Sequence, residues 1–290
     1  MRELSYTDHR RELGENRYIY PVVSRRSKGL SVGVNLNPDK VCNFDCPYCQ
    51  VDRTVPPAVT EVELSRLEAE LDALLAVAAS GRLWEEPPFD TVAPGLRRVN
   101  DVAFAGDGEP TAYAGFADAV RIAGRLIEEH GLEGVKPVVL TNATLLHRPR
   151  VREGLAELDR LGGEIWAKLD AGTAAYFARV DGTTFPFSRV LKNLEEAARV
   201  RPITIQSMFL TMDGEPPSEA ELDAWAGRLA RIQAAGGRVA LVQVYSVARR
   251  PSDEAIGHLP TSALEAIADR VRALDIPVEV YAGREWKENQ

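Results

Sequence analysis

Cysteine is scarce in this 290-residue chain, which has only three, and all three lie within one stretch of eight residues. An odd number of clustered cysteines excludes the paired disulfide framework of small secreted domains and favours metal or redox chemistry in a reducing compartment. Because there is no other cysteine, further cysteine-bound clusters and thiol-based group transfer are excluded as well. The chemistry of the thiols is therefore confined to one segment.

Other features are also absent from the sequence. No apolar run approaches the roughly 18 residues that a membrane-spanning helix needs, and the N-terminus lacks the apolar core of a signal peptide. Basic residues are not in excess, since 35 Lys and Arg face 43 Asp and Glu for a net charge of −8. Dedicated nucleic-acid binders are more often basic, so RNA is disfavoured as a substrate. We expect a soluble, cytoplasmic protein without a membrane partner.

Short β-rich runs alternate with amphipathic helical patterns along the chain, which predicts βαβ crossovers and a parallel sheet. Counting the cysteine-bearing unit, six β/α repeats are predicted, which fits either a partial barrel or a doubly wound open sheet. We expect an irregular N-terminal arm over residues 1–29, a single domain over residues 30–290 and an inserted loop at residues 84–98. Strands are predicted at residues 30–36, 99–105, 137–141, 164–170, 203–210, 238–245 and 277–281, and helices at residues 61–79, 112–129, 150–161, 188–200, 219–234 and 261–274.

Polar residues follow nearly every predicted strand. In parallel α/β folds, ligands bind beyond the carboxyl ends of the strands, so these residues are expected to line one face. Packing alone does not explain polar side chains at so many strand ends. The groups are Asn35 and Asn37 with the cysteines, residues 106–111, residues 141–144, residues 168–173, Gln206 with Ser207, and Gln243 with Tyr245, Arg249 and Arg250.

The three cysteines are Cys42, Cys46 and Cys49. Three thiolates on one loop can hold three corners of a cubic iron–sulfur cluster and leave the fourth iron open to a small molecule. The alternatives are a zinc site and reduced structural cysteines. A structural zinc site usually has two pairs of ligands from separate segments, which sum to four, so zinc fits this spacing less well. An electron-transfer cluster also fits less well, because it is expected to have four cysteines.

The pattern Cys42-x3-Cys46-x2-Cys49, with Tyr48 before the last cysteine, resembles the signature of radical S-adenosylmethionine (radical SAM) enzymes. The resemblance implies an α/β fold of the partial (β/α)6 TIM-like barrel type. It also implies an oxygen-sensitive [4Fe-4S] cluster whose open iron is chelated by S-adenosylmethionine. One electron then cleaves the cofactor to methionine and a 5′-deoxyadenosyl radical, which abstracts hydrogen from a small-molecule substrate. An external one-electron donor of flavodoxin or ferredoxin type is implied as a partner.

Residues 106–110 resemble the Gly-Gly-Glu element that helps to hold the methionyl amine in this family. The matching residues are Gly106, Asp107, Gly108 and Glu109. Asp107 departs from the small residue that is common there, so a backbone role is expected at that position; the alternative for the segment is a plain tight turn. Residues 108–111, 141–143 and 168–171 further resemble a subgroup related to wyosine-synthesis radical enzymes. The likeness runs from about residue 30 to residue 281.

The resemblance also implies roles for individual cofactor-binding residues. Tyr48 is expected near the adenine, Asn142 and Asp170 at the ribose, and Lys168 at the methionyl carboxylate. Each has a structural alternative, because Asn142 can instead cap its loop and Lys168 can form an internal ion pair with Asp170.

The residues expected at the substrate are a weaker inference from their positions late on the strands. Arg249 would grip an anionic group, with a solvated loop as the alternative. Competing functions are tRNA-base modification, activation of a glycyl-radical partner, cleavage of a different C–S bond with aminocarboxypropyl or methyl transfer, and a non-catalytic electron carrier. The expected substrate residues are Asn35, Gln206, Gln243, Tyr245 and Arg249.

Overall fold

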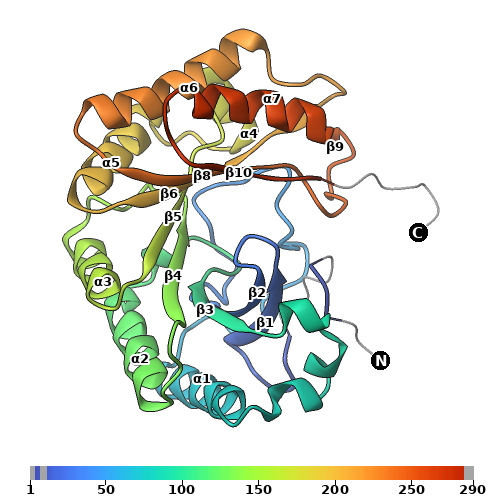
Figure 1. Cartoon of the computed structure of the whole chain (residues 1–290), viewed down its shortest axis with the longest axis vertical. Helices are drawn as coiled ribbons and strands as arrows, with labels where there is room; N and C mark the ends of the chain where they lie inside the picture. The colour runs from blue at the N-terminus through green and yellow to red at the C-terminus, as the bar shows by residue number, and fades with distance from the viewer. Residues whose placement is uncertain (1–3, 7–11, 284–290) are drawn as a thin grey trace. The chain divides into compact units, whose positions relative to one another are not determined.

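The computed structural model describes residues 4–6 and 12–283 (Figure 1). The chain divides into two compact units, each of which is described by itself. Unit 1 comprises Met1–Cys42, Arg53–Leu140 and Arg148–Glu164. Unit 2 comprises Asn43–Asp52, Thr141–His147 and Ile165–Gln290.

Unit 1 contains the first four strands. β2 (Gly29–Val34) pairs in parallel with β3 (Val99–Phe104), and β3 pairs in parallel with β4 (Lys136–Thr141). All six residues of β2 are buried, as expected for an apolar strand covered on both faces. The N-terminal arm was predicted to be irregular, but the structure places β1 (Ile19–Ser24) there, antiparallel to β2. The prediction was wrong because the short run gave little periodicity, whereas tertiary pairing with β2 stabilises it.

The helices of unit 1 are α1 (Leu64–Ala79), α2 (Phe116–Glu129) and α3 (Pro149–Arg160). α2 packs beside both α1 and α3 (Figure 1). The segment predicted as an inserted loop holds three short 3-10 turns, and a fourth begins after the turn that follows β3. These turns are Arg82–Glu85, Phe89–Thr91, Pro94–Leu96 and Pro110–Ala112.

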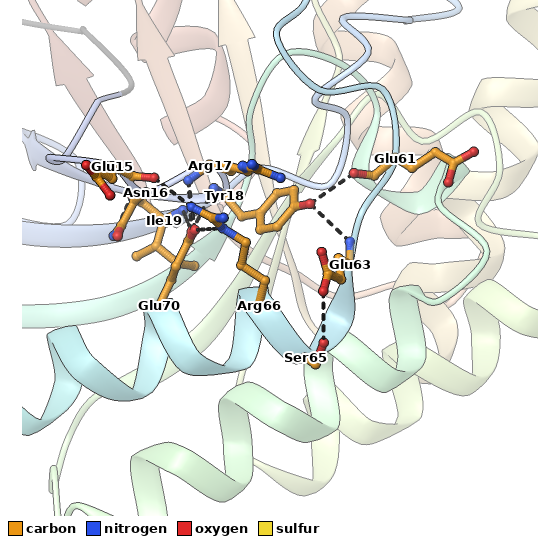
Figure 2. A network of polar contacts seen from close by, with 10 residues as sticks. All are labelled: Glu15, Asn16, Arg17, Tyr18, Ile19, Glu61, Glu63, Ser65, Arg66 and Glu70. Atoms are coloured by element: carbon orange, nitrogen blue, oxygen red, sulfur yellow. Dashed lines mark hydrogen bonds and ion pairs between the residues drawn. The ribbon is translucent and has the colours of Figure 1, made fainter.

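Glu70 of α1 fixes the entry of the chain into β1 (Figure 2). Its carboxylate accepts the backbone N–H groups of Arg17 at 2.9 and 3.0 Å, of Tyr18 at 2.9 Å and of Ile19 at 3.3 Å. Arg66, one helical turn earlier, donates to the same carboxylate at 2.8 Å. A buried carboxylate needs such donors to offset its lost hydration, and here three consecutive amides supply them.

Unit 2 holds the remaining strands. β5 (Glu164–Lys168), β6 (Ile203–Met208), β8 (Val239–Tyr245) and β10 (Val278–Tyr281) pair in parallel in that order. A separate antiparallel pair is formed by β7 (Leu210–Met212) and β9 (Ile256–His258). Figure 1 shows α7 lying over β8 and β10, beside α6. The helices of unit 2 are α4 (Ala174–Val180), α5 (Phe187–Val200), α6 (Glu219–Ala234) and α7 (Thr261–Arg272).

Trp225 of α6 ties its helix to the carboxyl ends of β5 and β6. The side chain is fully buried, and its Nε1 donates to the Leu169 carbonyl at 3.0 Å and to Ser207 Oγ at 3.1 Å. The Ser207 hydroxyl donates to the same carbonyl at 2.6 Å. A buried indole N–H needs a partner, so the strand ends are held where the predicted site residues begin.

The predicted alternation is confirmed, since a helix separates each of β2, β3, β4, β5, β6 and β8 from the next strand of the parallel series, and β10 comes last. The short strands β7 and β9 precede α6 and α7. The α/β class is therefore confirmed within the described ranges. Sequence periodicity missed α4, β7 and β9, which are short. It also missed β1, which has six residues like β2. No helix in the described part of the chain is both long enough and apolar enough to cross a membrane.

Candidate functional site

The cysteine loop crosses the boundary between the units, with Cys42 ending a segment of unit 1 and Cys46 and Cys49 lying in unit 2. All three thiols are reduced and partly exposed. The Cys49 N–H donates to the Cys46 carbonyl at 2.9 Å, which closes a tight turn between these two ligand candidates. The loop thus presents its sulfurs from a compact backbone.

The same loop packs against the end of α4. The Asp45 N–H lies 3.2 Å from the Asp181 carbonyl, and Gly182 follows with a φ of 56°. A Cβ atom at Gly182 would come within 1.9 Å of the Asp45 carbonyl oxygen. Only glycine fits here, because the backbone is left-handed and the loop leaves no room for a side chain.

Lys168, the last residue of β5, joins the cysteine loop to two buried carboxylates. Its ammonium lies 2.9 Å from Cys46 Sγ, 2.5 Å from Asp181 Oδ1 and 3.4 Å from Asp170 Oδ2. The Lys168 side chain is 18% exposed, whereas Asp170 and Asp181 are at 0% and 1%. We call Lys168, Cys46, Asp170, Asp181 and Tyr48 the lysine cluster.

Tyr48 completes the lysine cluster. Its hydroxyl donates to Asp170 Oδ2, while Asp170 Oδ1 accepts the Met208 N–H at 2.8 Å. The Lys168 ammonium lies over two rings of the cysteine loop, 4.7 Å from the centroid of Tyr48 and 5.3 Å from that of Phe44. Such cation–π contacts help to hold the ammonium in place beside the carboxylates.

The pKa values in the lysine cluster follow from burial and from the Lys168 charge. Burial raises the pKa of the Cys46 thiol to about 11, although the adjacent Lys168 ammonium opposes the shift. Burial likewise raises the pKa of Asp181 to about 6, again against Lys168. For Lys168, burial lowers the pKa, but the charges of Asp181, Cys46 and Asp170 outweigh burial and raise the pKa well above its usual value. Lys168 is therefore the fixed positive charge of the cluster.

A single metal ion and a cubic iron–sulfur cluster require different arrangements of their ligands. Among residues 4–6 and 12–283, no group of three or more His, Cys, Asp or Glu side chains is placed to hold a metal ion. A cubic cluster makes a different demand, because each cysteine ligates a different iron and the sulfurs do not converge on one point. Metal binding would take the proton from Cys46, and the Lys168 N–H then points at a ligating sulfur.

Asn142 connects the turn after β4 to the cysteine loop. Its Nδ2 donates to Asn43 Oδ1 at 2.7 Å, and its Oδ1 accepts the N–H and the hydroxyl of Thr144 at 3.1 and 2.7 Å. Asn193 of α5 donates to the carbonyls of Ala143 and Thr144 at 2.8 and 2.9 Å. The loop-capping alternative for Asn142 is present in this geometry, and the ribose contact stays a prediction.

In unit 1, the turn after β3 is organised by Asn35. Its Nδ2 donates to Asp107 Oδ2 at 2.7 Å, and its Oδ1 accepts the N–H groups of Asn37 and Asp107 at 3.0 and 3.2 Å. A Cβ atom at Gly106 would lie 2.3 Å from Asn35 Oδ1, and one at Gly108 would lie 2.1 Å from the Val41 carbonyl. Asp107 thus has a side-chain partner that the sequence did not predict.

Glu109 is buried and folds back on its own turn. Its carboxylate accepts the Thr111 N–H at 3.1 Å and the Thr111 hydroxyl. The role of this turn at the methionyl amine stays a prediction.

Two of the predicted substrate residues lie together in unit 2. Gln206 of β6 and Gln243 of β8 are register partners, and Gln206 Nε2 donates to Gln243 Oε1 at 2.7 Å. Tyr245 ends the same strand, and Arg249 lies partly exposed in the loop that follows. Asn35, the fifth, is the buried organiser of its turn in unit 1.

Three residues of this region were not predicted from the sequence. Asp181 follows a seven-residue helix that shows no clear periodicity, so nothing marked it as a partner of Lys168. Phe44 and Asn43 lie inside the cysteine motif, at positions where the spacing leaves the residue type open. Their position within the motif was the only signal.

Comparison with known proteins identifies the family. The family model of the radical SAM superfamily matches residues 36–226, more than half of the chain. A UPF0026 protein of Helicobacter pylori is 28% identical over 177 residues, which are 61% of this chain and 48% of the relative. This chain therefore spans about half the length of that relative.

Two solved structures are similar to the chain in fold. A radical SAM methyltransferase from Sphaerobacter thermophilus has a TM-score of 0.58 at 16% identity, over 91% of this chain and 69% of that one. TYW1, solved with a lysine–pyruvate adduct bound, has a TM-score of 0.50 at 16% identity, over 86% of this chain and 73% of that one. At such identities the likeness concerns the fold alone, and it confirms the predicted class, an α/β partial barrel of the radical SAM type. The chain belongs to the radical SAM superfamily.

Proposed function

We propose that this chain is an enzyme that cleaves S-adenosylmethionine reductively and uses the resulting 5′-deoxyadenosyl radical to abstract hydrogen from a small molecule. A [4Fe-4S] cluster held by Cys42, Cys46 and Cys49 would supply the electron and the open iron for the cofactor. The single observation that carries the proposal is the contact of Lys168 with Cys46 beside two buried carboxylates.

The residues of the lysine cluster have defined tasks in this proposal. Lys168 donates an N–H to the Cys46 sulfur. Such a hydrogen bond to a ligating sulfur would tune the reduction potential of the cluster. Asp170 and Asp181 hold the ammonium in place, and the rings of Phe44 and Tyr48 keep water from it. Asp170 also orients the Tyr48 hydroxyl, which fixes the ring that we assign to the adenine.

The turn at residues 106–109 and Asn142 are proposed to bind the cofactor through their backbone and amide groups. Asn35 and Asn43 hold these segments in shape, since each bonds directly to them. Gln206 and Gln243, joined by their side-chain hydrogen bond, are proposed to face the substrate with Tyr245 and Arg249. Membership of the subgroup related to wyosine synthesis is part of the proposal and rests on the sequence motifs.

The test is anaerobic reconstitution with iron and sulfide, followed by S-adenosylmethionine and dithionite. We expect 5′-deoxyadenosine and methionine as products. Cys46→Ala is expected to abolish both cluster assembly and cleavage, because two ligands do not retain a cubic cluster.

The product formed from S-adenosylmethionine also distinguishes the proposed reaction from the alternative functions. Methylthioadenosine would move the assignment to aminocarboxypropyl transfer, and a protein that binds only zinc and cleaves nothing would contradict the proposal. Hydrogen transfer from a tRNA, rather than from a small molecule, would keep the radical chemistry and replace the substrate class.

A further inference from the structure

A groove of about 650 Å³ runs between α5 and α6 in unit 2. Four basic side chains line it, together with the acidic Glu195 and Glu196 and the ring of Phe187. We call this surface the basic groove. The basic side chains are Lys192, Arg199, Arg228 and Arg231.

The positive charge of the basic groove stands out because the chain as a whole carries −8. Arg231 pairs with Glu195 at 2.7 Å, and Lys192 lies 3.8 Å from Glu196. The side chains of Lys192 and Arg231 are nevertheless 70% and 66% exposed. Their charged ends are therefore within reach of a partner's carboxylates, whereas Glu195 itself is only 12% exposed.

Three packed phenylalanine rings lead from the basic groove to the cysteine loop. Phe187 lines the groove under the Arg228 guanidinium, which lies 5.8 Å from the ring centroid. Phe187 stacks on Phe177 at 4.7 Å between centroids with planes 25° apart. Phe177 contacts Phe44 edge to face at 5.5 Å. Phe44 lies between Cys42 and Cys46, so the column ends inside the cysteine motif.

We propose that the basic groove is the docking surface of an acidic one-electron carrier protein, and that Phe187, Phe177 and Phe44 form the packed route for the electron. This rests on the proposed function. The reduced carrier loses one electron, the cluster gains it, and no bond or proton changes hands in this step. The carrier is of flavodoxin or ferredoxin type, since such proteins are acidic.

Charge and packing favour this occupant. Electron transfer slows steeply with distance and is faster through packed atoms than across gaps, so a donor is best placed where a continuous ring column begins. Single-stranded RNA also seeks positive charge, but it binds through exposed aromatic platforms. Phe187 is only 6% exposed and the groove carries two carboxylates, which disfavours a polyanion with stacked bases.

The first experiment reverses the charge of the groove in the cluster-loaded enzyme. Lys192→Glu/Arg231→Glu is compared with wild type for flavodoxin binding by calorimetry at low and high salt, and for cluster reduction by reduced flavodoxin in stopped flow. Electrostatic steering changes association rates by 10-fold to 10³-fold, so we expect roughly tenfold or greater loss of rate at low salt and less at high salt.

The matched control is Arg160→Glu/Arg272→Glu. These arginines are exposed, bonded to acidic neighbours and outside the lining of the groove. Their reversal changes the net charge equally, and we expect less than half of the loss seen for the groove variant. Equal losses in both variants would overturn the proposal, because net charge alone would then explain them.

The second experiment interrupts the ring column. Phe177→Leu keeps an apolar side chain and removes the ring, whereas Phe209→Leu does the same to a ring that contacts Trp225 outside the column. We expect Phe177→Leu to slow reduction by bound flavodoxin with unchanged flavodoxin affinity, and Phe209→Leu to leave that rate near wild type. An unchanged rate for Phe177→Leu would overturn the route.

Reduction by dithionite distinguishes the two proposals. A small reductant needs no docking surface, so all four variants should cleave S-adenosylmethionine like wild type when dithionite is the donor. If they do and the groove variant still accepts electrons from flavodoxin at the wild-type rate, the docking proposal fails while the proposed function stands. The docking proposal would also be overturned if the wild-type protein bound a short single-stranded RNA in the groove and did not bind flavodoxin there.

Discussion

Glu70 in unit 1 and Asp181 in unit 2 are both buried carboxylates, and they are stabilised by different kinds of partner. Glu70 receives three consecutive backbone N–H groups, from Arg17 to Ile19. Asp181 pairs at 2.5 Å with the Lys168 ammonium, which also contacts a thiol and a second carboxylate. The first arrangement is fixed by the course of the chain, and the second depends on side chains alone.

The difference separates a structural from a reactive environment. Backbone amides neither titrate nor move independently, so the Glu70 contacts persist as long as β1 is paired. The lysine cluster contains groups that gain or lose protons, and metal binding at Cys46 would replace the proton of its sulfur. Its geometry is therefore tied to the state of Cys46, which suits a site and not a scaffold.

The largest expected effect comes from breaking the lysine cluster. Lys168→Met leaves Asp170 and Asp181 buried without a counter-charge, which is expected to lower the free energy of unfolding by roughly 3–5 kcal/mol. Urea unfolding of the purified protein measures this. Lys168→Met/Asp181→Asn, which removes one of the stranded charges, should recover much of the loss.

The matched control is Lys192→Met, because that ammonium lies on the surface 3.8 Å from Glu196. Its cost is expected to stay within about 0.5 kcal/mol. If Lys168→Met cost no more than Lys192→Met, the lysine cluster would not be the charged counterpart of the Glu70 site.

Asp101 of β3 is a buried carboxylate with a third kind of partner, the side chains of two serines. Burial raises its pKa to about 6, although hydrogen bonds from Ser31 and Ser27 and the charge of Lys136 oppose the shift, and Glu164 adds to it. Between the unfolded value near 4 and about 6, the folded state holds more protons than the unfolded state. Stability therefore falls as pH rises through this window, by about 3 kcal/mol in total.

Asp101→Asn is expected to remove its share of that slope and to leave the share of Asp181, whose pKa is raised to about 6 as well; urea unfolding of the iron-free protein across the window measures this. Asp118→Asn, at an exposed position of α2, should retain the slope. A slope as steep as that of the wild type after Asp101→Asn would mean that Asp101 does not contribute to the pH dependence.

The smallest of the three effects is expected at Glu70. Glu70→Gln keeps the size of the side chain but places an NH2 group among N–H donors, which is expected to cost about 2 kcal/mol and to speed amide hydrogen exchange at Arg17 to Ile19. Arg66→Met removes a 34% exposed partner of the same carboxylate, so less than about 1 kcal/mol is expected. Equal costs would mean that the backbone contacts contribute little.

The fold was largely predictable, because the apolar spacing within each long helix or strand is visible in its own sequence. α6 has the predicted bounds, since its apolar spacing and the Ser218 cap mark both the face and the start. β1 was not predictable in this way, because the contacts that hold it come from Glu70, 51 or more residues away in sequence. Glu70 itself looks like an ordinary acidic residue on an amphipathic helix.

The candidate site was predictable only in part. The sequence suggested an ion pair between Lys168 and Asp170, and the structure contains it at 3.4 Å. Nothing in the sequence indicated that Lys168 contacts Cys46 or that Asp181 is the carboxylate nearer to Lys168. Those contacts depend on how α4 packs on the cysteine loop. The cofactor roles stay predictions that the reconstitution experiment tests.

The tight fit of Gly182 against Asp45 has a consequence for biosynthesis. The ribosome makes the three cysteines first, and the residues that pack on their loop, such as Asp181, follow about 135 positions later. Domains fold largely as units once their sequence is available. The nascent cysteine loop therefore has no residues to pack against until the segment around Asp181 has been made, and we expect any cluster to be inserted only after that point.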